Sequence, residues 1–259
     1  VKPITIQKDN LISAESYILG NLETGVIYIK SNENKVFPIA SISKLIVALV
    51  AIHNIDTNKK VIINEDMLKA YGNAGGLVAG EVYTIKELLY PLLLESSNDA
   101  AEAIAQSFTG GYQGFLYQMN SFVNELGMNN TSFKDASGLS SGNVSNALDL
   151  FILSRYIFNN EKDLLVLTKN YTASLASTTE HAGHIYKAID PFVLDPNFIG
   201  GKTGRTIEAK ESMLSLFNYS LNSSIKLPIS VIVLRSDFSS REIDTSILFE
   251  QFMRMNKSI

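Results

Sequence analysis

Residues 37–52 read FPIASISKLIVALVAI, an apolar run in which only Ser41, Ser43 and Lys44 are polar. The spacing of the apolar residues becomes helical from Ser41 to about Asn54, which predicts a buried helix. Lys44 follows Ser41 by three residues on one helix face, so its amine can approach the serine hydroxyl. The spacing Ser-x-x-Lys is common, and alone it does not separate a helix cap from a reactive pair. We assign no role to Ser43.

A serine hydroxyl becomes a nucleophile only when a base accepts its proton. A lysine serves as that base when burial or a neighbouring cation lowers the pKa of its amine. The apolar residues that follow Lys44 provide such a low-dielectric setting. The alternative is that Ser41 caps the helix and that Lys44 is a solvated residue of the first turn.

The composition is that of a globular chain with a sizeable core. Of the 259 residues, 46% are hydrophobic and 19% are charged, and the net charge is -4. A nucleic-acid-binding protein would concentrate lysine and arginine, and no long basic run is present, so we expect no nucleic-acid partner. The chain has no cysteine, which excludes disulfide bonds, cysteine-ligated metals and a thiol nucleophile.

The first ten residues, VKPITIQKDN, lack the basic and apolar regions of a signal peptide. The longest apolar stretch, residues 45–52, is well short of the ~20 residues that cross a bilayer. We therefore expect a soluble chain, or one from which a targeting segment has been removed, and no membrane anchor within it.

Alternating residues near both ends predict strands, and helical spacing predicts helices between them. Residues 16–37 indicate a hairpin with its turn at Glu23-Thr24-Gly25. Thr84 and Glu87 form a capping-box pattern that opens a helix, and we expect Pro91 to kink it or end it early. Further helices are predicted over residues 99–108, 114–127, 147–158 and 241–256, and strands over residues 198–206, 212–220 and 228–236.

This order of elements predicts an α/β (α+β) fold with one mostly antiparallel sheet built from both termini and flanked by helices. An all-helical subdomain is inserted between the two parts of the sheet. We expect a single domain over residues 1–259, with a sheet subdomain of about 1–55 and 166–259 and a helical subdomain of about 56–165. The site should lie in the cleft between the two subdomains.

Two further stretches carry polar residues where a site can form. LLLESSNDAAEAIA, residues 92–105, places Ser96 and Asn98 in a short turn between two helices. FIGGKTGRT, residues 198–206, places Lys202 and Thr203 between glycines of a predicted strand, where a glycine often marks the close approach of a ligand or another backbone. Each signal alone is weak, because polar residues in turns usually cap helices.

Together, in this order and at these separations, the three stretches resemble the motifs of the serine penicillin-binding proteins and β-lactamases. The motifs here are Ser41-x-x-Lys44, Ser96-x-Asn98 and Lys202-Thr203-Gly204. ESSNDAAEAIA, MNSFVNELGMNNTSFKDASGL and NVSNALDLFILSRYIF are similar to the low-molecular-weight D-alanyl-D-alanine carboxypeptidases. The resemblance runs roughly from residue 10 to the end. It implies the penicillin-binding/β-lactamase-like fold and an enzyme that removes the terminal D-alanine of peptidoglycan stem peptides.

The resemblance implies a role in the reaction for several residues. Ser41 is the nucleophile that forms the acyl-enzyme, and Lys44 is the base that takes its proton. Ser96 relays a proton to the leaving group. The backbone N–H groups of Ser41 and Arg205 form the oxyanion hole.

The resemblance also implies how the substrate is held. Asn98 binds the substrate amide, and Lys202 and Thr203 bind the terminal carboxylate through charge-assisted hydrogen bonds. The strand around Gly204 pairs with the substrate backbone. Family members usually carry a different residue at the position of Arg205, whose side chain adds a second positive charge near the carboxylate site.

The resemblance implies β-lactam antibiotics as inhibitors, no metal or organic cofactor, and action outside the cytoplasm, where peptidoglycan is found. We expect a monomer. Relatives often continue into a β-rich domain, whereas this sequence ends in a predicted helix.

Four alternatives compete with this assignment. A β-lactamase needs a base for deacylation, and Glu125 to Asn129 has the Glu-x-x-x-Asn spacing of one class, although we interpret Glu125 as a solvated helix-end residue. Gly138 to Gly142 matches Gly-x-Ser-x-Gly, but no strand and helix flank Ser140, so we expect a loop serine there. A sensor that acylates without turnover would keep the same three motifs.

His181 and His184 are expected to be ordinary surface or loop residues rather than metal ligands.

Overall fold

The computed structural model describes residues 11–72, 74–220 and 226–256. The N-terminal segment on which the signal-peptide expectation rests lies outside these residues. The elements, in chain order, are β1 (Ser16–Asn21), β2 (Ile27–Ser31), β3 (Phe37–Pro38), the 3₁₀ turn η1 (Ala40–Ser43), α1 (Lys44–Asn54), β4 (Lys60–Ile62), β5 (Val82–Thr84), α2 (Ile85–Leu94), α3 (Asn98–Ser107), α4 (Gly111–Glu125), β6 (Val144–Ser145), α5 (Ala147–Asn160), α6 (Lys162–Lys169), β7 (Thr172–Leu175), β8 (His184–Lys187), η2 (Pro191–Leu194), β9 (Phe198–Thr206), β10 (Lys210–Ser220), β11 (Lys226–Ser236) and α7 (Arg241–Asn256).

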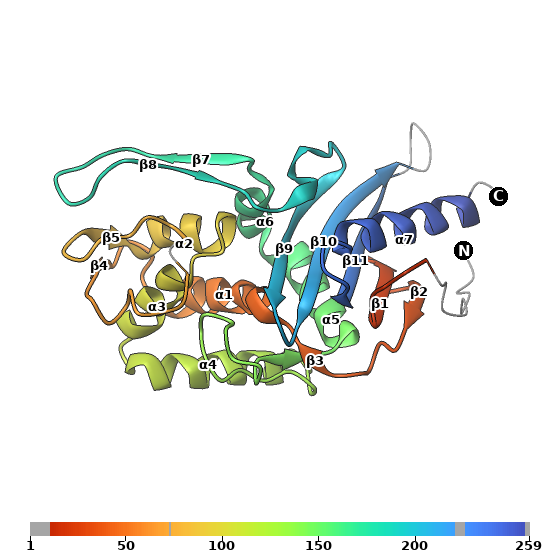
Figure 1. Ribbon diagram of the computed structural model, residues 1–259, viewed down its shortest axis with the longest axis horizontal. Coiled ribbons are helices and arrows are strands. Elements are labelled where there is room, and N and C mark those ends of the chain that lie inside the picture. The colour runs from red at the N-terminus through yellow and green to blue at the C-terminus, as the bar shows by residue number, and fades with distance from the viewer. Residues whose placement is uncertain (1–10, 73, 221–225, 257–259) are drawn as a thin grey trace.

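One antiparallel sheet combines strands from both ends of the chain, in the order β2-β1-β11-β10-β9. The predicted N-terminal hairpin is formed by β1 and β2, and β11 joins it with Tyr17 opposite Val233. Figure 1 shows the sheet at one end of the molecule and most of the helices at the other. The prediction of a mostly antiparallel sheet from both termini, with helices inserted between its parts, is confirmed.

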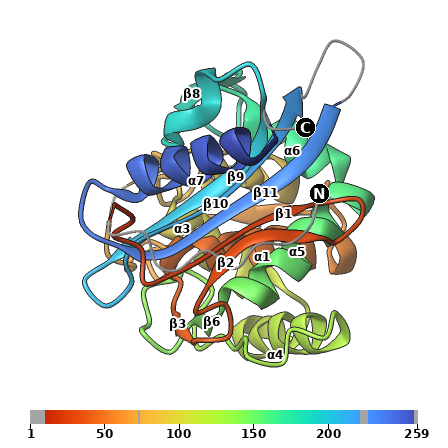
Figure 2. The ribbon, with the colours of Figure 1, turned by 90° about the vertical axis from the view of Figure 1, so that its right-hand side faces the viewer.

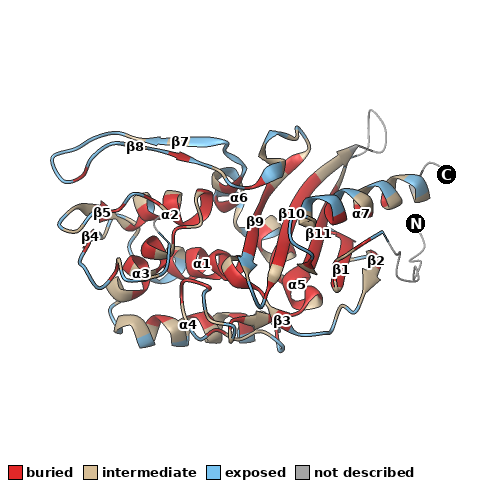
Figure 3. Ribbon diagram, viewed as in Figure 1, coloured by how far each residue is buried: buried red, intermediate tan, exposed pale blue. Residues whose placement is uncertain are grey.

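The sheet has a hydrophobic core on each face because its strands alternate with a period of two. In β11, Val231 and Val233 belong to the core that includes Leu248 and Phe252 of α7. Ile232 and Leu234 belong to the other core, which the helices α1 to α5 complete. Figure 2 shows α7 crossing one face of the sheet and α5 lying on the other side. Both faces are therefore covered; β1 and most of β11 are buried, whereas the edge strand β2 is only partly buried (Figure 3).

The stretch at residues 37–52 forms the turn η1 followed by the helix α1, which is buried from Lys44 to Ala51. The predicted helix is confirmed, with its first turn in 3₁₀ geometry. The predicted capping box is also present, because Glu87 N donates to Thr84 Oγ1 and Thr84 N donates to the Glu87 carboxylate. These two bonds satisfy free N–H groups at the start of α2.

Of the two effects expected of Pro91, an early end of its helix is wrong, and a kink stays a prediction. The helix α2 continues through Pro91 to Leu94, and Leu92, Leu93 and Leu94 are all buried. An interior proline costs roughly 3 kcal/mol through the lost hydrogen bond and a clash with the preceding turn. Burial of three leucine side chains, each contributing about 1.5–3 kcal/mol, outweighs that cost.

The helix α6 and the strands β4, β5, β6, β7 and β8 have no counterpart among the sequence predictions. The helix α6 packs against β9, and the hairpin of β7 and β8 extends alongside the helical part (Figure 1). Near the tip of this hairpin, Val82 N of β5 donates to Glu180 O over 3.0 Å. In the part of the chain that the structure describes, no helix is both long and apolar enough to cross a membrane.

Candidate active site

Ser41 and Lys44 lie at the junction of η1 and α1. The turn places Lys44 Nζ 3.0 Å from Ser41 Oγ. The Lys44 side chain is fully buried although it begins a helix. The alternative interpretation of Lys44 as a solvated first-turn residue is therefore wrong.

Two further oxygens surround the amine of Lys44. Asn98 Oδ1 accepts a hydrogen bond from Nζ over 2.7 Å, and the backbone carbonyl of Ser137 accepts another. Gly138 brings this carbonyl close, because a Cβ on Gly138 would lie 2.7 Å from both Ala40 O and Ser43 Oγ. The loop that holds Ser137 thus packs directly on η1, and Ser43 is part of that contact.

The surroundings of Lys44 disfavour its charged form. Burial is the main cause that holds the pKa of Lys44 well below its usual range, and the positive charge of Lys202 adds to the effect. The carboxylates of Asp135 and Glu102 act in the opposite direction. The neutral amine that a general base requires is therefore favoured at Lys44.

Ser96 and Asn98 come from the short connection between α2 and α3. Ser96 has φ 60°, a left-handed conformation that is unusual for a residue with a side chain. Ser97 caps α3 by accepting from Ala100 N, so that Asn98 opens the helix. Asn98 Nδ2 donates to Tyr71 O over 2.6 Å. Because its Oδ1 accepts from Lys44, both ends of the Asn98 amide are engaged.

Lys202 approaches the same place from β9. Its Nζ atom donates to Ser96 Oγ over 2.9 Å and to Thr203 O over 3.1 Å. Burial lowers the pKa of Lys202 to about 7; the negative charge of Asp190 opposes this shift, and the positive charge of Arg241 adds to it. The three sequence motifs therefore meet through two buried amines and their hydrogen bonds.

Gly204 allows β9 to pass directly over the turn that carries Ser41. A Cβ on Gly204 would lie 2.4 Å from Ile39 O and 3.3 Å from Ser41 N, so only glycine fits here. The next side chain, Arg205, is largely exposed; its guanidinium lies 3.8 Å from Glu211 and over the Phe238 ring. The second positive charge expected from Arg205 thus has an acidic neighbour.

Three groups of the site were missed by sequence reasoning. The Ser137 carbonyl is a backbone group, and its residue type gives no signal. Asp190 is buried beside Lys202, with one carboxylate oxygen unpartnered, and both residues line one small internal hollow. Arg241, at the start of α7, directs Nη1 toward Gly204 O at 3.5 Å. The sequence gives only a weak signal for Asp190 and Arg241. Each is a charged residue next to a predicted turn, and such residues are common.

The family follows from a comparison with sequence families. The sequence model of one family, described as D-alanyl-D-alanine carboxypeptidase, matches residues 3–230. The chain belongs to this family. The match spans all three motifs that meet at Ser41 and Lys44.

Individual relatives are similar over half or more of the chain. A relative named D-alanyl-D-alanine carboxypeptidase DacF, from Bacillus subtilis, is 31% identical over 203 residues, which cover 76% of this chain and 52% of the relative. A D-alanyl-D-alanine endopeptidase from Escherichia coli is 36% identical over 144 residues, covering 54% of this chain and 46% of that protein. The chain thus spans about half the length of these two relatives.

Solved structures support the same fold. A D-alanyl-D-alanine carboxypeptidase from Mycobacterium tuberculosis superposes with a TM-score of 0.83 at 26% identity, covering 96% of this chain and 94% of that one. Penicillin-binding protein D2 of Listeria monocytogenes, in its cefotaxime-bound form, gives a TM-score of 0.81 at 25% identity, with 94% and 98% covered. The predicted penicillin-binding fold is confirmed.

Glu125 and Ser140, on which the β-lactamase and Gly-x-Ser-x-Gly alternatives rest, do not have the surroundings that those alternatives require. Glu125 is the exposed last residue of α4, where it accepts from Ser121 Oγ, as expected for a solvated helix-end residue. Ser140 lies in an irregular loop; its N–H donates to Asp135, and its hydroxyl accepts from Gly142 N. No strand-to-helix elbow presents it, which is the geometry that a Gly-x-Ser-x-Gly nucleophile requires.

The two histidines near the hairpin differ from the expectation in one respect. His184 is half-buried on β8, but His181 is buried and stacks on the Tyr83 ring. His181 is therefore a loop residue, as one half of the expectation had it, but it is buried rather than on the surface. Across residues 11–72, 74–220 and 226–256, no group of three or more histidine, aspartate or glutamate side chains is placed to hold a metal ion.

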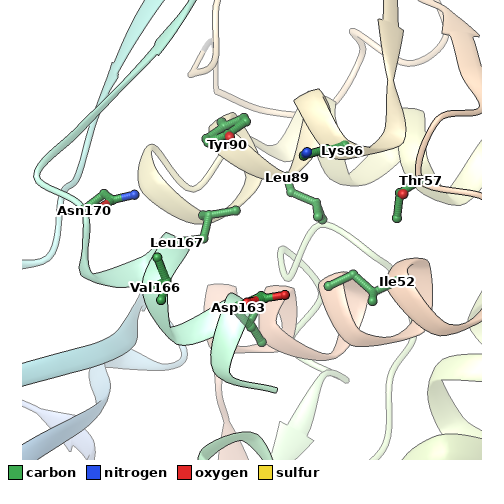
Figure 4. Close-up of a pocket in the computed structure, with 10 residues that line it drawn as sticks. Ile52, Thr57, Lys86, Leu89, Tyr90, Asp163, Val166, Leu167 and Asn170 are labelled. Atoms are coloured by element: carbon green, nitrogen blue, oxygen red, sulfur yellow. The ribbon is translucent and has the colours of Figure 1, made fainter. Parts of the chain in front are cut away.

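A separate hollow of about 440 Å³ lies between α1, α2 and α6. Figure 4 shows Ile52 and Leu89 lining it, with Lys86 and Asp163 among its polar groups. None of the residues from the three motifs lines it. It is distinct from the candidate active site.

Proposed function

We propose that this chain is a serine D-alanyl-D-alanine carboxypeptidase that releases the terminal D-alanine of peptidoglycan stem peptides. The observation that carries the proposal is the buried Lys44 amine, 3.0 Å from Ser41 Oγ, with its pKa held low by burial. A serine beside a neutral amine is an activated nucleophile. Membership of the family supports the choice of substrate.

The acylation step uses the three contacts of Lys44. A neutral amine has two N–H bonds and one lone pair, and the oxygens of Asn98 and Ser137 accept the two N–H bonds. The lone pair then faces the Ser41 hydroxyl, which donates its proton to Nζ as Oγ attacks the carbonyl carbon of the scissile bond. The backbone N–H groups of Ser41 and Arg205 stabilise the oxyanion, where the loss of one donor typically costs about 10²–10³ in rate.

Ser96 completes the step at the leaving group. Its hydroxyl accepts from Lys202, so its own proton is free to pass to the departing D-alanine nitrogen. The proton that Lys44 took from Ser41 then replaces the one that Ser96 gave, which leaves Ser96 a hydroxyl and Lys44 neutral. Lys202 and Thr203 bind the terminal carboxylate, and Asn98 binds the substrate amide. Arg241 adds positive charge near Gly204, where the substrate backbone pairs with β9. Water then hydrolyses the acyl-enzyme on Ser41 and regenerates the free hydroxyl.

The proposal extends to location, partners and domain organisation. Peptidoglycan lies outside the cytoplasm, so the chain works in the cell envelope and is inhibited by β-lactams that acylate Ser41. The cefotaxime-bound relative supports the inhibitor class. The sheet subdomain of about 1–55 and 166–259 and the helical subdomain of about 56–165 act as one catalytic domain, because β9 supplies Lys202 and the α2–α3 connection supplies Ser96.

A second candidate is endopeptidase activity on cross-linked stem peptides, favoured by the similarity to the Escherichia coli D-alanyl-D-alanine endopeptidase. The two activities share the acylation apparatus and differ in the group that leaves. D-alanine release from a synthetic acyl-D-Ala-D-Ala peptide, beside cleavage of a purified cross-linked dimer, tests the proposal. The carboxypeptidase proposal predicts release of D-alanine, in a reaction that chelators leave unchanged. Cleavage of the dimer alone would contradict it, and neither product would contradict both candidates.

A further inference from the structure

The carboxylate of Glu95 joins two segments that lie far apart in the sequence. Its Oε2 accepts from Gly75 N over 3.1 Å, and its Oε1 accepts from Lys187 N over 3.1 Å. Gly75 belongs to the loop between β4 and β5, whereas Lys187 ends β8. Glu95 itself follows α2 and directly precedes Ser96. The Glu95 side chain thus links three segments: the connection between α2 and α3, the loop between β4 and β5, and the hairpin of β7 and β8.

The loop held by Glu95 also contacts the next two motif residues. Ser97 Oγ donates to Ala74 O over 2.6 Å, and Asn98 Nδ2 donates to Tyr71 O over 2.6 Å. A Cβ on Gly75 would lie 2.6 Å from Ser97 Oγ, so the loop backbone packs tightly against the connection. The loop therefore forms one wall that orients Ser97 and Asn98, and the Glu95 carboxylate fixes that wall.

The hairpin reaches Glu95 through a second contact. His184 Nε2 lies 3.8 Å from Glu95 Oε1, and the imidazole packs against the backbone of Gly76, where a Cβ would lie 2.7 Å from His184 Cε1. Nearby, Ile189 N donates to Leu94 O over 3.0 Å, so the chain after β8 is also tied to the end of α2. These contacts make β8 a rigid support behind the carboxylate.

Ser96 is the residue on which this support acts most directly. Its φ of 60° is a strained conformation that persists only when its neighbours hold it. Its hydroxyl must stay 2.9 Å from Lys202 Nζ. The residue before it is fixed by two hydrogen bonds from separate elements.

We infer that Glu95 is a positioning residue for Ser96 and Asn98, and that it acts by clamping residues 74–76 and β8 to the connection between α2 and α3. The inference rests on the proposed function, because positioning matters only if these two side chains serve the reaction. A small displacement of reacting groups is sufficient to lower a rate by orders of magnitude.

Glu95→Gln tests the clamp with little change in side-chain size. The substitution replaces one acceptor oxygen with an NH₂ donor, so either Gly75 N or Lys187 N loses its partner. Glu81→Gln is the matched control: its carboxylate accepts from Ala182 N of the same hairpin and from Val78 N of the same β4–β5 connection, but it does not adjoin the motif. The measurements are the second-order acylation rate with a fluorescent penicillin, the unfolding midpoint, and amide hydrogen exchange.

In Glu95→Gln we expect acylation to slow by about tenfold or more, because the attack geometry is lost. Amide exchange should rise in residues 74–76 and 184–189. In Glu81→Gln, amide exchange should rise near residues 78 and 182. Acylation should stay within about twofold of the wild type, because the two hydrogen bonds of Glu95 remain in place. Acylation of Glu95→Gln within twofold of the wild type, or equal slowing in both variants, would overturn the inference. If the wild type is not acylated by penicillin, the proposed function is contradicted, and the inference about Glu95 is then tested by amide hydrogen exchange alone. Exchange in Glu95→Gln equal to that of the wild type would refute the inference.

Discussion

Lys44 Nζ lies 2.7 Å from Asn98 Oδ1, and this hydrogen bond joins two motifs that are 54 residues apart in the sequence. The bond has two effects. It takes one N–H bond of the Lys44 amine, and it fixes the orientation of the Asn98 amide, whose Nδ2 is already bound to Tyr71 O. The proposed base for Ser41 and the group that we propose holds the substrate amide are therefore set by one contact.

Lys44→Met should abolish most acylation while the protein stays folded. Methionine fills a similar volume in the buried site but cannot accept the Ser41 proton, and the loss of a general base typically lowers a rate by about 10²–10⁴. Asn98 Oδ1 and the Ser137 carbonyl lose their donor, so a fall in the unfolding midpoint is also expected. The acylation rate with penicillin and near-UV circular dichroism check both points. An acylation rate close to that of the wild type would show that Lys44 is not the base.

The pH dependence of acylation should report Lys202. Burial lowers the pKa of this amine to about 7, so its positive charge is present below about pH 7 and is lost above it. Penicillin carries a carboxylate that this charge binds, so the acylation rate should fall as the pH rises through about 7. Lys202→Arg keeps a permanent charge and should remove this alkaline decline. A rate that stays constant from pH 6 to pH 9 in the wild type would contradict the assignment.

Asp190→Asn should move that decline to lower pH. The negative charge of Asp190 raises the pKa of Lys202, so its removal favours the neutral amine. Burial raises the pKa of Asp190 to about 6, and at pH 7 the carboxylate is mostly ionised and supplies this charge. Rate profiles of the two proteins with the same penicillin make the comparison. Superimposable profiles would mean that Asp190 does not influence Lys202.

Gly138→Ala should damage both stability and acylation. The residue has φ 86°, and its Cβ would lie 2.7 Å from Ala40 O, so the loop that carries the Ser137 carbonyl must shift. Gly80→Ala is the control: φ is 92°, and a Cβ there meets no atom within 4 Å. The control should lose about 1–2 kcal/mol from the left-handed backbone alone. Gly138→Ala should lose about 1–3 kcal/mol more from overpacking, measured by denaturant unfolding. Equal losses, or an unchanged acylation rate in Gly138→Ala, would argue against this packing.

Glu125→Gln should leave the lifetime of the penicillin acyl-enzyme unchanged. The carboxylate is exposed at the end of α4 and accepts from Ser121 Oγ of its own helix, so we do not propose it as the group that activates the deacylating water. The lifetime is measured by the return of free enzyme after excess penicillin is removed. Rapid turnover of a chromogenic cephalosporin by the wild type, lost in Glu125→Gln, would instead indicate a β-lactamase.

Much of the fold was predictable because its signals are local. The short run of mostly β-branched apolar residues within 228–236 indicated β11, and the Thr84 and Glu87 pair indicated the start of α2. The end of α2 was not predictable from Pro91, because tertiary burial of the following leucines outweighs the local penalty. The hairpin of β7 and β8 was missed since most of its residues are exposed or half-buried, which leaves no clear apolar period.

The candidate site was predictable only where side chains form a recognisable spacing. Ser41 and Lys44 are three residues apart, so a helical turn brings them together whatever the rest of the fold does. The contact between Ser96 and Lys202 spans 106 residues, and only the family resemblance indicated it. Asp190 influences Lys202 through burial and charge, which depend on packing that the sequence does not display.

The central claim is that Ser41 forms the acyl-enzyme with Lys44 as its base. Intact-mass spectrometry after incubation with penicillin tests it most directly, with wild type, Ser41→Ala and Ser140→Ala measured side by side. We predict one long-lived adduct with the mass of the whole penicillin on the wild type and on Ser140→Ala, and none on Ser41→Ala. An adduct that persists on Ser41→Ala, or its absence from the wild type, would contradict the account.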